Sequence, residues 1–221
     1  MKKFTRTMLA ATLTVAGASG CSLQQAMSAD QPRPTAPAGD VAAALASIPV
    51  RPEGGMEGYD RDAFDVWSDH GDECDTRAVL LKQTSSTPAR VNDNCTVQSG
   101  SWRDAYTGRT VTDPGDLDVD HLIPLAEAWR SGAADWPTEL REHFGNDLEH
   151  GNLVVADSSA NRSKGDQDPA SWLPSYDRCG YVTRYIQVTA YWNQQAAATG
   201  HQLSIDPAEK QALEHELANC G

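Results

Sequence analysis

Two short segments of the chain hold most of the side chains that could carry out chemistry. The first contains Asp120 and His121 side by side, and the second contains Asn152, Asn161 and Lys164. A histidine has an unperturbed pKa of about 6.5, which suits a general base near neutral pH. Carboxylate and amide oxygens are hard ligands that suit Mg²⁺ or Mn²⁺. Together these residue types predict metal-assisted hydrolysis of a phosphodiester bond.

The first segment has the pattern of a short strand. Leu117 and Val119 alternate with acidic residues, which is typical of a strand with one buried face. Pro124 prevents the strand from continuing inside a sheet. Asp120 and His121 are consecutive, so on a regular strand they would point to opposite sides. We therefore expect them to serve one reaction centre only at a strand end or bend. Asp118, in contrast, is expected to be a solvent-facing acid.

The second segment predicts a strand followed by a helix. Leu153-Val154-Val155 is a short run rich in β-branched residues, and Asp157 or Ser158 can cap a helix that begins near Ser159. Asn161 would then lie in the first turns of this helix, with Lys164 one turn further on. The two segments and the long stretch between them therefore predict a ββα unit.

These residues resemble the HNH endonucleases, which are also called His-Me finger or ββα-metal nucleases. One branch is especially similar: the secreted HNH proteins related to the nuclease domain of GmrSD-type modification-dependent restriction enzymes. The resemblance spans roughly residues 56 to 220. It includes one departure, at Gly145, where alanine is commoner. We expect Gly145 to touch no proposed catalytic position. The matching strings are Asp118 to Trp129, Arg130-Ser131-Gly132-Ala133, Asn146-Asp147 and Ser171-Trp172-Leu173-Pro174.

The resemblance implies a role for each residue of the site. His121 would be the general base that deprotonates the attacking water. Asp120 and Asn161 would bind one divalent metal ion, Mg²⁺ or Mn²⁺. Asn152 would orient His121 by holding the loop that carries it. The residues alone leave Asn152 open to a second interpretation, as the cap of a turn.

Four basic residues are candidates for contact with the substrate phosphate: Arg162, Lys164, Arg130 and Arg77. For Arg162 and Lys164 the alternative is a solvated helix face. The resemblance implies a nucleic acid substrate, with DNA favoured over RNA, and a monomeric enzyme.

The charge of the chain opposes a nuclease function. The net charge is −13, and it becomes −16 if Lys2, Lys3 and Arg6 leave with a leader peptide. Such acidity predicts weak non-specific affinity and slow association with a polyanion. It does not exclude a local cationic cleft, because a bound divalent ion is itself a large positive charge.

The N-terminus has the pattern of an export signal. Residues 1–20 combine a basic start with an apolar stretch too short to span a bilayer, and they end just before Cys21. This ending resembles a bacterial lipobox, which would make Cys21 a lipidation site and the only membrane anchor. Ordinary cleavage after Ala26 is the alternative. Either route predicts an extracellular or cell-surface protein, with a tether over residues 21–50 and the nuclease domain over 51–221.

The remaining cysteines support export. Cys74, Cys95, Cys179 and Cys220 allow three pairings. We favour Cys74 with Cys95 and Cys179 with Cys220, because each pair brackets a compact segment. Their spacing fits no zinc motif, and an even set of cysteines is typical of an oxidising compartment.

The sequence thus predicts a mostly helical α+β single domain built around a ββα-metal motif, with two disulfides. A helix over Asp40 to Ile48, or disorder there, is expected in the tether. A non-catalytic alternative remains: a cell-surface lipoprotein that keeps the ββα scaffold only for binding. Further helices are predicted over Asp75–Leu81, Pro124–Ser131, Pro137–Phe144, Tyr181–Gln195 and from Asp206 onward, with a hairpin near Asn94–Trp102 that turns at Gly100.

Overall fold

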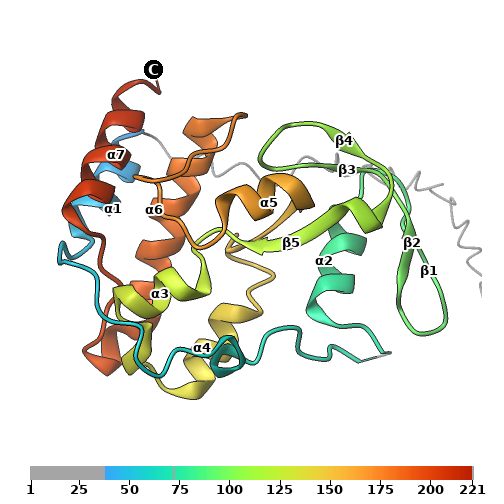
Figure 1. The fold of residues 1–221 in the computed structure, drawn as a ribbon, viewed down its shortest axis with the longest axis horizontal. Coiled ribbons are helices and arrows are strands. Elements are labelled where there is room, and N and C mark those ends of the chain that lie inside the picture. Colours follow the sequence, from blue (N-terminus) through green and yellow to red (C-terminus); the bar gives the residue numbers. More distant parts are fainter. Residues whose placement is uncertain (1–37, 72, 221) are drawn as a thin grey trace, which may run out of the picture.

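The computed structural model describes residues 38–71 and 73–220. The predicted leader, Cys21 and the tether up to residue 37 lie outside the described residues. Within them the chain forms a mixed α/β domain of seven α-helices and three two-stranded antiparallel sheets (Figure 1). None of the helices in this part of the chain is long and apolar enough to cross a membrane. The predicted α+β class is confirmed at this level.

The central pair of strands is β5 (Leu117–His121) with β6 (Leu153–Asp157), and it leads directly into helix α5 (Ser158–Lys164). The strands are antiparallel, with His121 opposite Leu153 and Leu117 opposite Asp157. The Asp157 side chain accepts hydrogen bonds from the backbone N–H groups of Ser159 and Ala160, which caps α5 as expected. The order of strand, insertion, strand and helix therefore agrees with the sequence prediction.

The two faces of this strand pair belong to two separate hydrophobic cores. Val154 and Ala156 point into the large core, which the helices of the domain build. Val119 and Val155 point into the small core, which includes Cys74 and Cys95. The strand pair is therefore held between two cores, and the polar residues at its ends are positioned by packing on both sides.

The large core is made by five helices and their connections. Val41 and Leu45 of α1 are buried in it, so part of the segment predicted as a tether packs against the domain. The predicted helix over Asp40 to Ile48 is confirmed, but it begins at Ala38, which places Asp40 in its first turn. The five helices of the large core are α1 (Ala38–Ser47), α3 (Leu125–Ser131), α4 (Thr138–Gly145), α6 (Arg178–Gln195) and α7 (Pro207–Ala218).

The described residues also form short 3₁₀ turns throughout the domain. They are η1 (Arg61–Phe64), η2 (Pro114–Asp116), η3 (Ala133–Asp135) and η4 (Ala196–Thr199).

Helix α7 begins with the capping arrangement that the sequence predicts. Asp206 accepts hydrogen bonds from the backbone N–H groups of Ala208 and Glu209, and the Glu209 side chain accepts from the backbone N–H of Asp206. Pro207 occupies the first turn, where its missing N–H costs nothing.

The small core is covered by α2 (Thr76–Thr84) and by the strand pairs β1 (Arg90–Val91) with β2 (Val97–Ser99) and β3 (Trp102–Arg103) with β4 (Thr110–Val111). The hairpin predicted to turn at Gly100 is wrong, because β2 and β3 pair with other strands. Trp102 explains the difference: its indole N–H donates to the Leu81 carbonyl at 2.8 Å, and its ring lies against Gly100. The tryptophan therefore turns the chain away from β2 and into the core.

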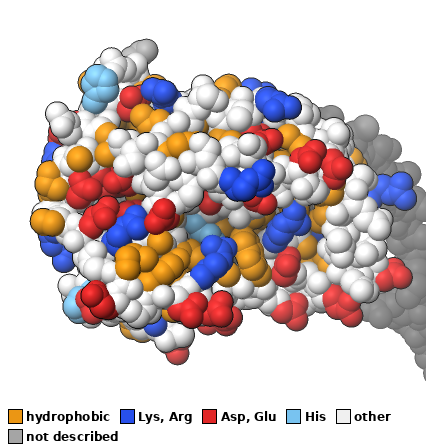
Figure 2. Space-filling view, viewed as in Figure 1, with side chains coloured by type: hydrophobic (Ala, Val, Ile, Leu, Met, Phe, Trp, Pro, Cys, Tyr) orange, Lys and Arg blue, Asp and Glu red, His pale blue; other side chains and the backbone are white. Residues whose placement is uncertain are grey.

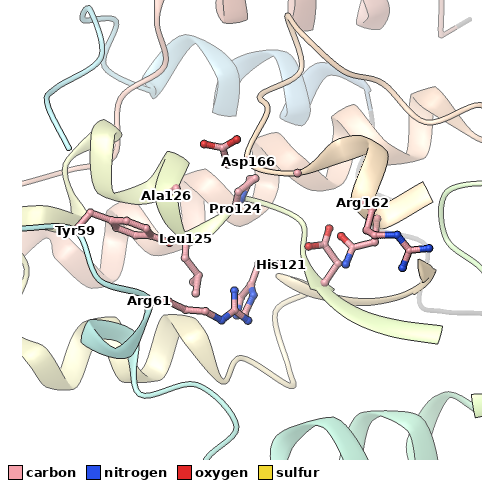
Figure 3. A pocket seen from close by; sticks show the side chains of 11 residues that line it. Tyr59, Arg61, His121, Pro124, Leu125, Ala126, Arg162 and Asp166 are labelled. Carbon is pink, nitrogen blue, oxygen red and sulfur yellow. The ribbon is translucent and has the colours of Figure 1, made fainter. Parts of the chain in front are cut away.

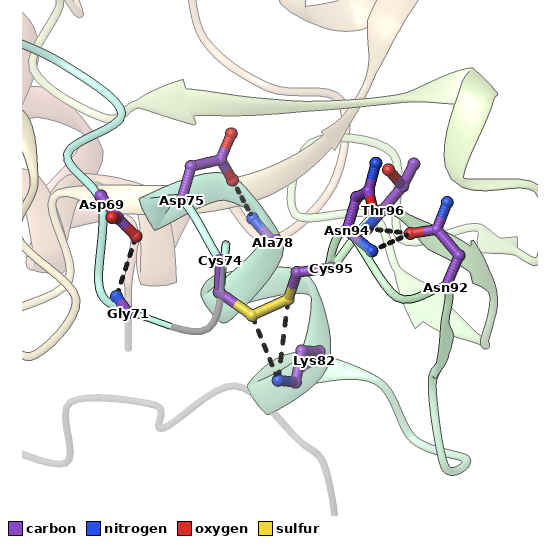
Figure 4. The surroundings of a disulfide bond; sticks show 10 residues. All are labelled: Asp69, Gly71, Cys74, Asp75, Ala78, Lys82, Asn92, Asn94, Cys95 and Thr96. Atoms are coloured by element: carbon purple, nitrogen blue, oxygen red, sulfur yellow. Dashed lines mark hydrogen bonds between the residues drawn. A yellow bond between two sulfur atoms is a disulfide. The ribbon is translucent and has the colours of Figure 1, made fainter.

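Both predicted disulfides are confirmed. Cys74–Cys95 joins the segment before α2 to the turn before β2 (Figure 4), and Cys179–Cys220 joins the first turn of α6 to the end of α7. Closing loops of this length stabilises a fold by about 3–4 kcal/mol each. Each core thus has its own covalent link.

Candidate active site

The ends of β5, α5 and η1 line one pocket with a volume of about 290 Å³. It brings together Asp120, His121, Asn161 and Arg162, and it adds Arg61, which the sequence did not single out. Figure 3 shows Arg61 reaching from η1 toward His121, while Arg162 comes from α5 on the other side. Figure 2 shows a hollow in the middle of this face, with a histidine in it and basic side chains around it.

His121 is held in one tautomer by the backbone. The residue as a whole is 2% exposed, and its Nε2 lies 2.8 Å from the carbonyl oxygen of Gly145. A carbonyl oxygen can only accept, so Nε2 must carry the hydrogen of this bond. In the neutral ring Nδ1 is then the nitrogen with a lone pair, which is the form that a general base requires.

Burial also keeps this imidazole neutral. Loss of solvation lowers the pKa of His121 from its ordinary value to about 4, although the hydrogen bond to Gly145 and the charge of Asp120 oppose the shift. The positive charges of Arg61 and Lys164 lower it further. His121 is therefore unprotonated near pH 7 and able to accept a proton.

Gly145 contacts the candidate base directly, so the expectation that it touches no proposed catalytic position is wrong. Its carbonyl is the acceptor for His121 Nε2. A Cβ atom at this position would lie 2.8 Å from the Phe64 carbonyl oxygen and 3.0 Å from the Val66 side chain. Because η1 approaches the end of α4 so closely, glycine allows the packing that brings Arg61 and His121 to the same pocket.

Asn152 fastens the loop that follows His121. Its side-chain oxygen accepts from the Ile123 N–H at 3.1 Å, and its side-chain nitrogen donates to the Phe144 carbonyl at 3.2 Å. Its own carbonyl accepts from the Leu122 N–H at 2.6 Å. A single buried asparagine thus joins the chain after β5 to the end of α4, where the His121 acceptor lies.

Asp120 is fixed by two donors on the same oxygen. Its Oδ2 accepts from the Tyr106 hydroxyl at 2.5 Å and from Lys164 Nζ at 2.7 Å, and Lys164 also donates to the His121 carbonyl at 2.8 Å. These bonds leave Oδ1 as the oxygen through which Asp120 could bind a cation. Tyr106 is not evident from the sequence, because no local pattern links it to a residue fourteen positions later.

Asn161 is oriented by Asp118. Its side-chain nitrogen donates to Asp118 Oδ2 at 3.0 Å, so its side-chain oxygen is left for another partner. Asp118 was expected to face solvent, but it is half-buried and positions the side chain of Asn161. Asp118 and Asp120 lie on the same face of β5, and α5 packs against this strand, which brings Asn161 to Asp118.

The four candidate phosphate-binding residues lie in different settings. Arg162 is exposed at the pocket and, like Arg61, has no carboxylate partner among residues 38–71 and 73–220. Lys164 is fully buried against Asp120, and burial lowers its pKa although Asp120 opposes this. Arg130 forms ion pairs with Glu53, Glu127 and Asp166, and Arg77 donates to the Pro114 and Leu117 carbonyls at 3.1 Å.

The donor set of the pocket fits a hard divalent cation. Asp120 Oδ1 and Asn161 Oδ1 are oxygen donors on side chains whose other atoms are already bonded, and both residues line the same cavity. Two protein oxygens leave coordination positions for water and phosphate, as Mg²⁺ and Mn²⁺ sites usually do. The buried Lys164 does not prevent this, because it uses the opposite oxygen of Asp120.

Comparison with known proteins identifies the family. The family model described as "GmrSD restriction endonucleases, C-terminal domain" matches residues 58–203. The chain belongs to this family. The matched range contains the pocket residues from Tyr59 to Asp166.

A relative from Arthroderma benhamiae, named an uncharacterized secreted protein, is 38% identical over 190 residues, which cover 85% of this chain and 88% of the relative. No solved structure matches the chain.

Proposed function

We propose that this protein is a metal-dependent endonuclease of the HNH type that hydrolyses phosphodiester bonds in nucleic acid, with DNA as the favoured substrate. One observation carries the proposal most directly. His121, Asp120 and Asn161 line one pocket, and each has one polar atom bonded to the protein and another left for catalysis or ligand binding. Membership of a family named for restriction endonucleases supports the same activity.

In this proposal His121 Nδ1 takes the proton from the water that attacks phosphorus. The hydrogen bond from Nε2 to the Gly145 carbonyl keeps the ring oriented and becomes stronger as the imidazole gains charge. Asn152 positions the base by holding its loop. Arg61 and Arg162 are the cations with charge to offer a phosphate, because Lys164 and Arg130 are engaged by carboxylates.

Asp120 and Asn161 would hold one divalent ion, Mg²⁺ or Mn²⁺. When bound, such an ion supplies Lewis-acid stabilisation of the charge that develops on the phosphate and on the leaving oxygen. Lys164 and Tyr106 then act on the carboxylate alone: they fix its rotation through Oδ2 and leave Oδ1 for the ion.

We further propose that the protein acts outside the cytoplasm, in the extracellular space or at the cell surface. The two disulfides support this location, because such bonds persist in oxidising compartments. The relative from Arthroderma benhamiae is named a secreted protein, which agrees with it.

The test is cleavage of a supercoiled plasmid by the purified protein. Nicks should form with Mg²⁺ or Mn²⁺, stop in EDTA, and carry 5′-phosphate and 3′-hydroxyl ends. Asp120→Asn should need a higher Mn²⁺ concentration for half-maximal rate, because it weakens the metal site. Cleavage that persists under thorough chelation would contradict the metal mechanism, and the absence of any cleavage would favour the non-catalytic binding scaffold.

A further inference from the structure

Trp67 contacts two functional side chains of the candidate active site at once. Its ring centroid lies 5.9 Å from that of His121, and the two planes are tilted by 42°. The guanidinium carbon of Arg61 lies 5.8 Å from the centroid of the tryptophan ring, within the range of a cation–π contact. Among the described residues, Arg61 and His121 line the pocket, whereas Trp67 does not. The tryptophan is therefore placed to act on these two side chains and not on the substrate itself.

The backbone around Trp67 is strained. Its φ angle is 68°, in the left-handed region that a bulky side chain rarely adopts, and Asp65 shortly before it has a φ of 40°. Such conformations persist only where the surrounding structure holds them, and they cluster at functional sites. The position of Trp67 is therefore maintained by contacts with other segments and not by its own backbone preference.

Asn146 fastens the strained loop on both sides. Its side-chain oxygen accepts hydrogen bonds from the Ser68 N–H at 2.9 Å and from the Thr76 hydroxyl at 2.7 Å. Its side-chain nitrogen donates to the Asp65 carbonyl at 2.8 Å and to the Glu142 carbonyl at 2.9 Å. All the hydrogen-bonding capacity of the amide is thus used. The amide therefore ties both ends of the loop to the end of α4 and to the first residue of α2.

The end of α4 that anchors this loop also provides the acceptor of the candidate base. Gly145, directly before Asn146, accepts the hydrogen bond from His121 Nε2. That bond fixes the position of Nε2, but the imidazole plane can still tilt about it. A ring packed against the imidazole restricts this tilt, which decides where the Nδ1 lone pair points. Catalytic groups must be held within about 10–20° of their productive orientation.

We propose that Trp67 is a positioning residue for His121 and Arg61, and that Asn146 holds it in place. The inference rests on the proposed nuclease function, because it explains how the base and one phosphate-binding cation of that site are directed into the same pocket (Figure 3). It also gives a role to Asn146, which belongs to one of the strings that match the HNH branch.

The test is the rate of plasmid nicking at several plasmid concentrations, which separates kcat from KM. Trp67→Leu keeps apolar bulk beside the small core but removes the aromatic face. Its kcat should fall about 10–100-fold, because rate is lost steeply when a catalytic group is misplaced. The Mn²⁺ concentration for half-maximal rate should stay that of the parent. Trp67→Phe retains an aromatic ring and should keep most of the kcat.

Three further variants separate positioning from binding and from stability. Arg61→Ala should raise KM with little effect on kcat, so the lower kcat of Trp67→Leu reports on His121. Trp102→Phe changes another tryptophan of the small core and removes its hydrogen bond to Leu81. It should lower the Tm but leave the kcat of the folded fraction, measured by circular dichroism, unchanged.

Asn146→Ala should also lower kcat, and the double variant with Trp67→Leu should fall no further than the more damaging single variant, because both changes act on one contact. A kcat of Trp67→Leu equal to that of the parent would overturn the role of Trp67. Additive losses in the double variant would overturn the role of Asn146.

Nuclear magnetic resonance distinguishes failure of this inference from failure of the proposed function. The imidazole signals of His121, assigned with His121→Ala, should be sharp in the parent and in Trp67→Phe. They should broaden in Trp67→Leu, because the ring then exchanges between orientations. This pattern in a protein that cuts no DNA would refute the nuclease function alone. A parent that cuts DNA, with sharp signals and an unchanged rate in Trp67→Leu, would refute the positioning role alone.

Discussion

The candidate active site and the region around the start of α7 both collect carboxylates, but the protein holds these groups in different ways. In the active site a protein cation, Lys164, is buried against Asp120, and a tyrosine hydroxyl shares the same oxygen. At the start of α7, Asp206 accepts hydrogen bonds from the backbone N–H groups of Ala208 and Glu209, and the nearby Asp168 accepts from those of Ala170 and Ser171. The carboxylate of the active site is therefore held by side chains from distant segments, whereas those near α7 are held by the turns that carry them.

Loss of the proposed base should reduce activity more than stability. His121→Ala removes the proposed base, and general-base assistance is worth about 10²–10⁴ in rate. The rate of plasmid cleavage should fall by this factor, while metal affinity stays close to that of the parent. The measurement is the cleavage rate against Mn²⁺ concentration, with exposed His143→Ala as the matched control.

Rescue of His121→Ala by added metal would mean that the roles of His121 and Asp120 are exchanged. A rate equal to that of the parent would remove this strand from the mechanism and favour the binding scaffold.

Lys164→Met breaks the buried pair that organises the active site. Removal of one partner of a buried ion pair costs about 3–5 kcal/mol, because the other charge is left without compensation. The free energy of unfolding, measured in urea, should fall by an amount close to this range. The double variant with Asp120→Asn should recover part of the loss. An unchanged free energy of unfolding would mean that this pair does not stabilise the site.

The smallest expected effect concerns the exposed arginines of the pocket. Arg61→Ala and Arg162→Ala should each weaken substrate binding uniformly across sequences and reduce the slope of log affinity against log salt by about 0.7–0.9. Arg90→Ala is the matched control, because Arg90 is an exposed residue of β1, in the strand pair that covers the small core. The measurement is binding of labelled DNA at several salt concentrations without divalent metal. An unchanged slope in both variants would place the phosphate contacts elsewhere.

The sequence predicted local features well where one segment determined the outcome. The cap of α7 at Asp206, the cap of α5 at Asp157 and both disulfides agree with the structure. These features depend on nearby residues, on turn chemistry or on a small number of possible pairings. The meeting of Asp120 and His121 at a strand end could be predicted for the same reason.

The sequence did not predict contacts between distant segments. Arg61 enters the pocket because η1 packs against Gly145, and Tyr106 reaches Asp120 through the core. Asp118 was expected in solvent because its strand pattern alone does not reveal that α5 covers that face. Trp102 likewise disrupted the predicted hairpin through a hydrogen bond to α2. In each case tertiary packing decided the position of the side chain.

The placement of β5 and β6 between two cores also bears on the order in which the molecule opens. Val119 and Val155 belong to the small core, whereas Val154 belongs to the large one. We expect the amide hydrogens that bond β5 to β6 to exchange with solvent slowly, because their exposure requires both cores to separate from the strand pair. The short pair of β1 with β2 has exposed residues and can open alone. The candidate base therefore sits at the end of the slowest-exchanging part of the backbone, although its pocket is open to water.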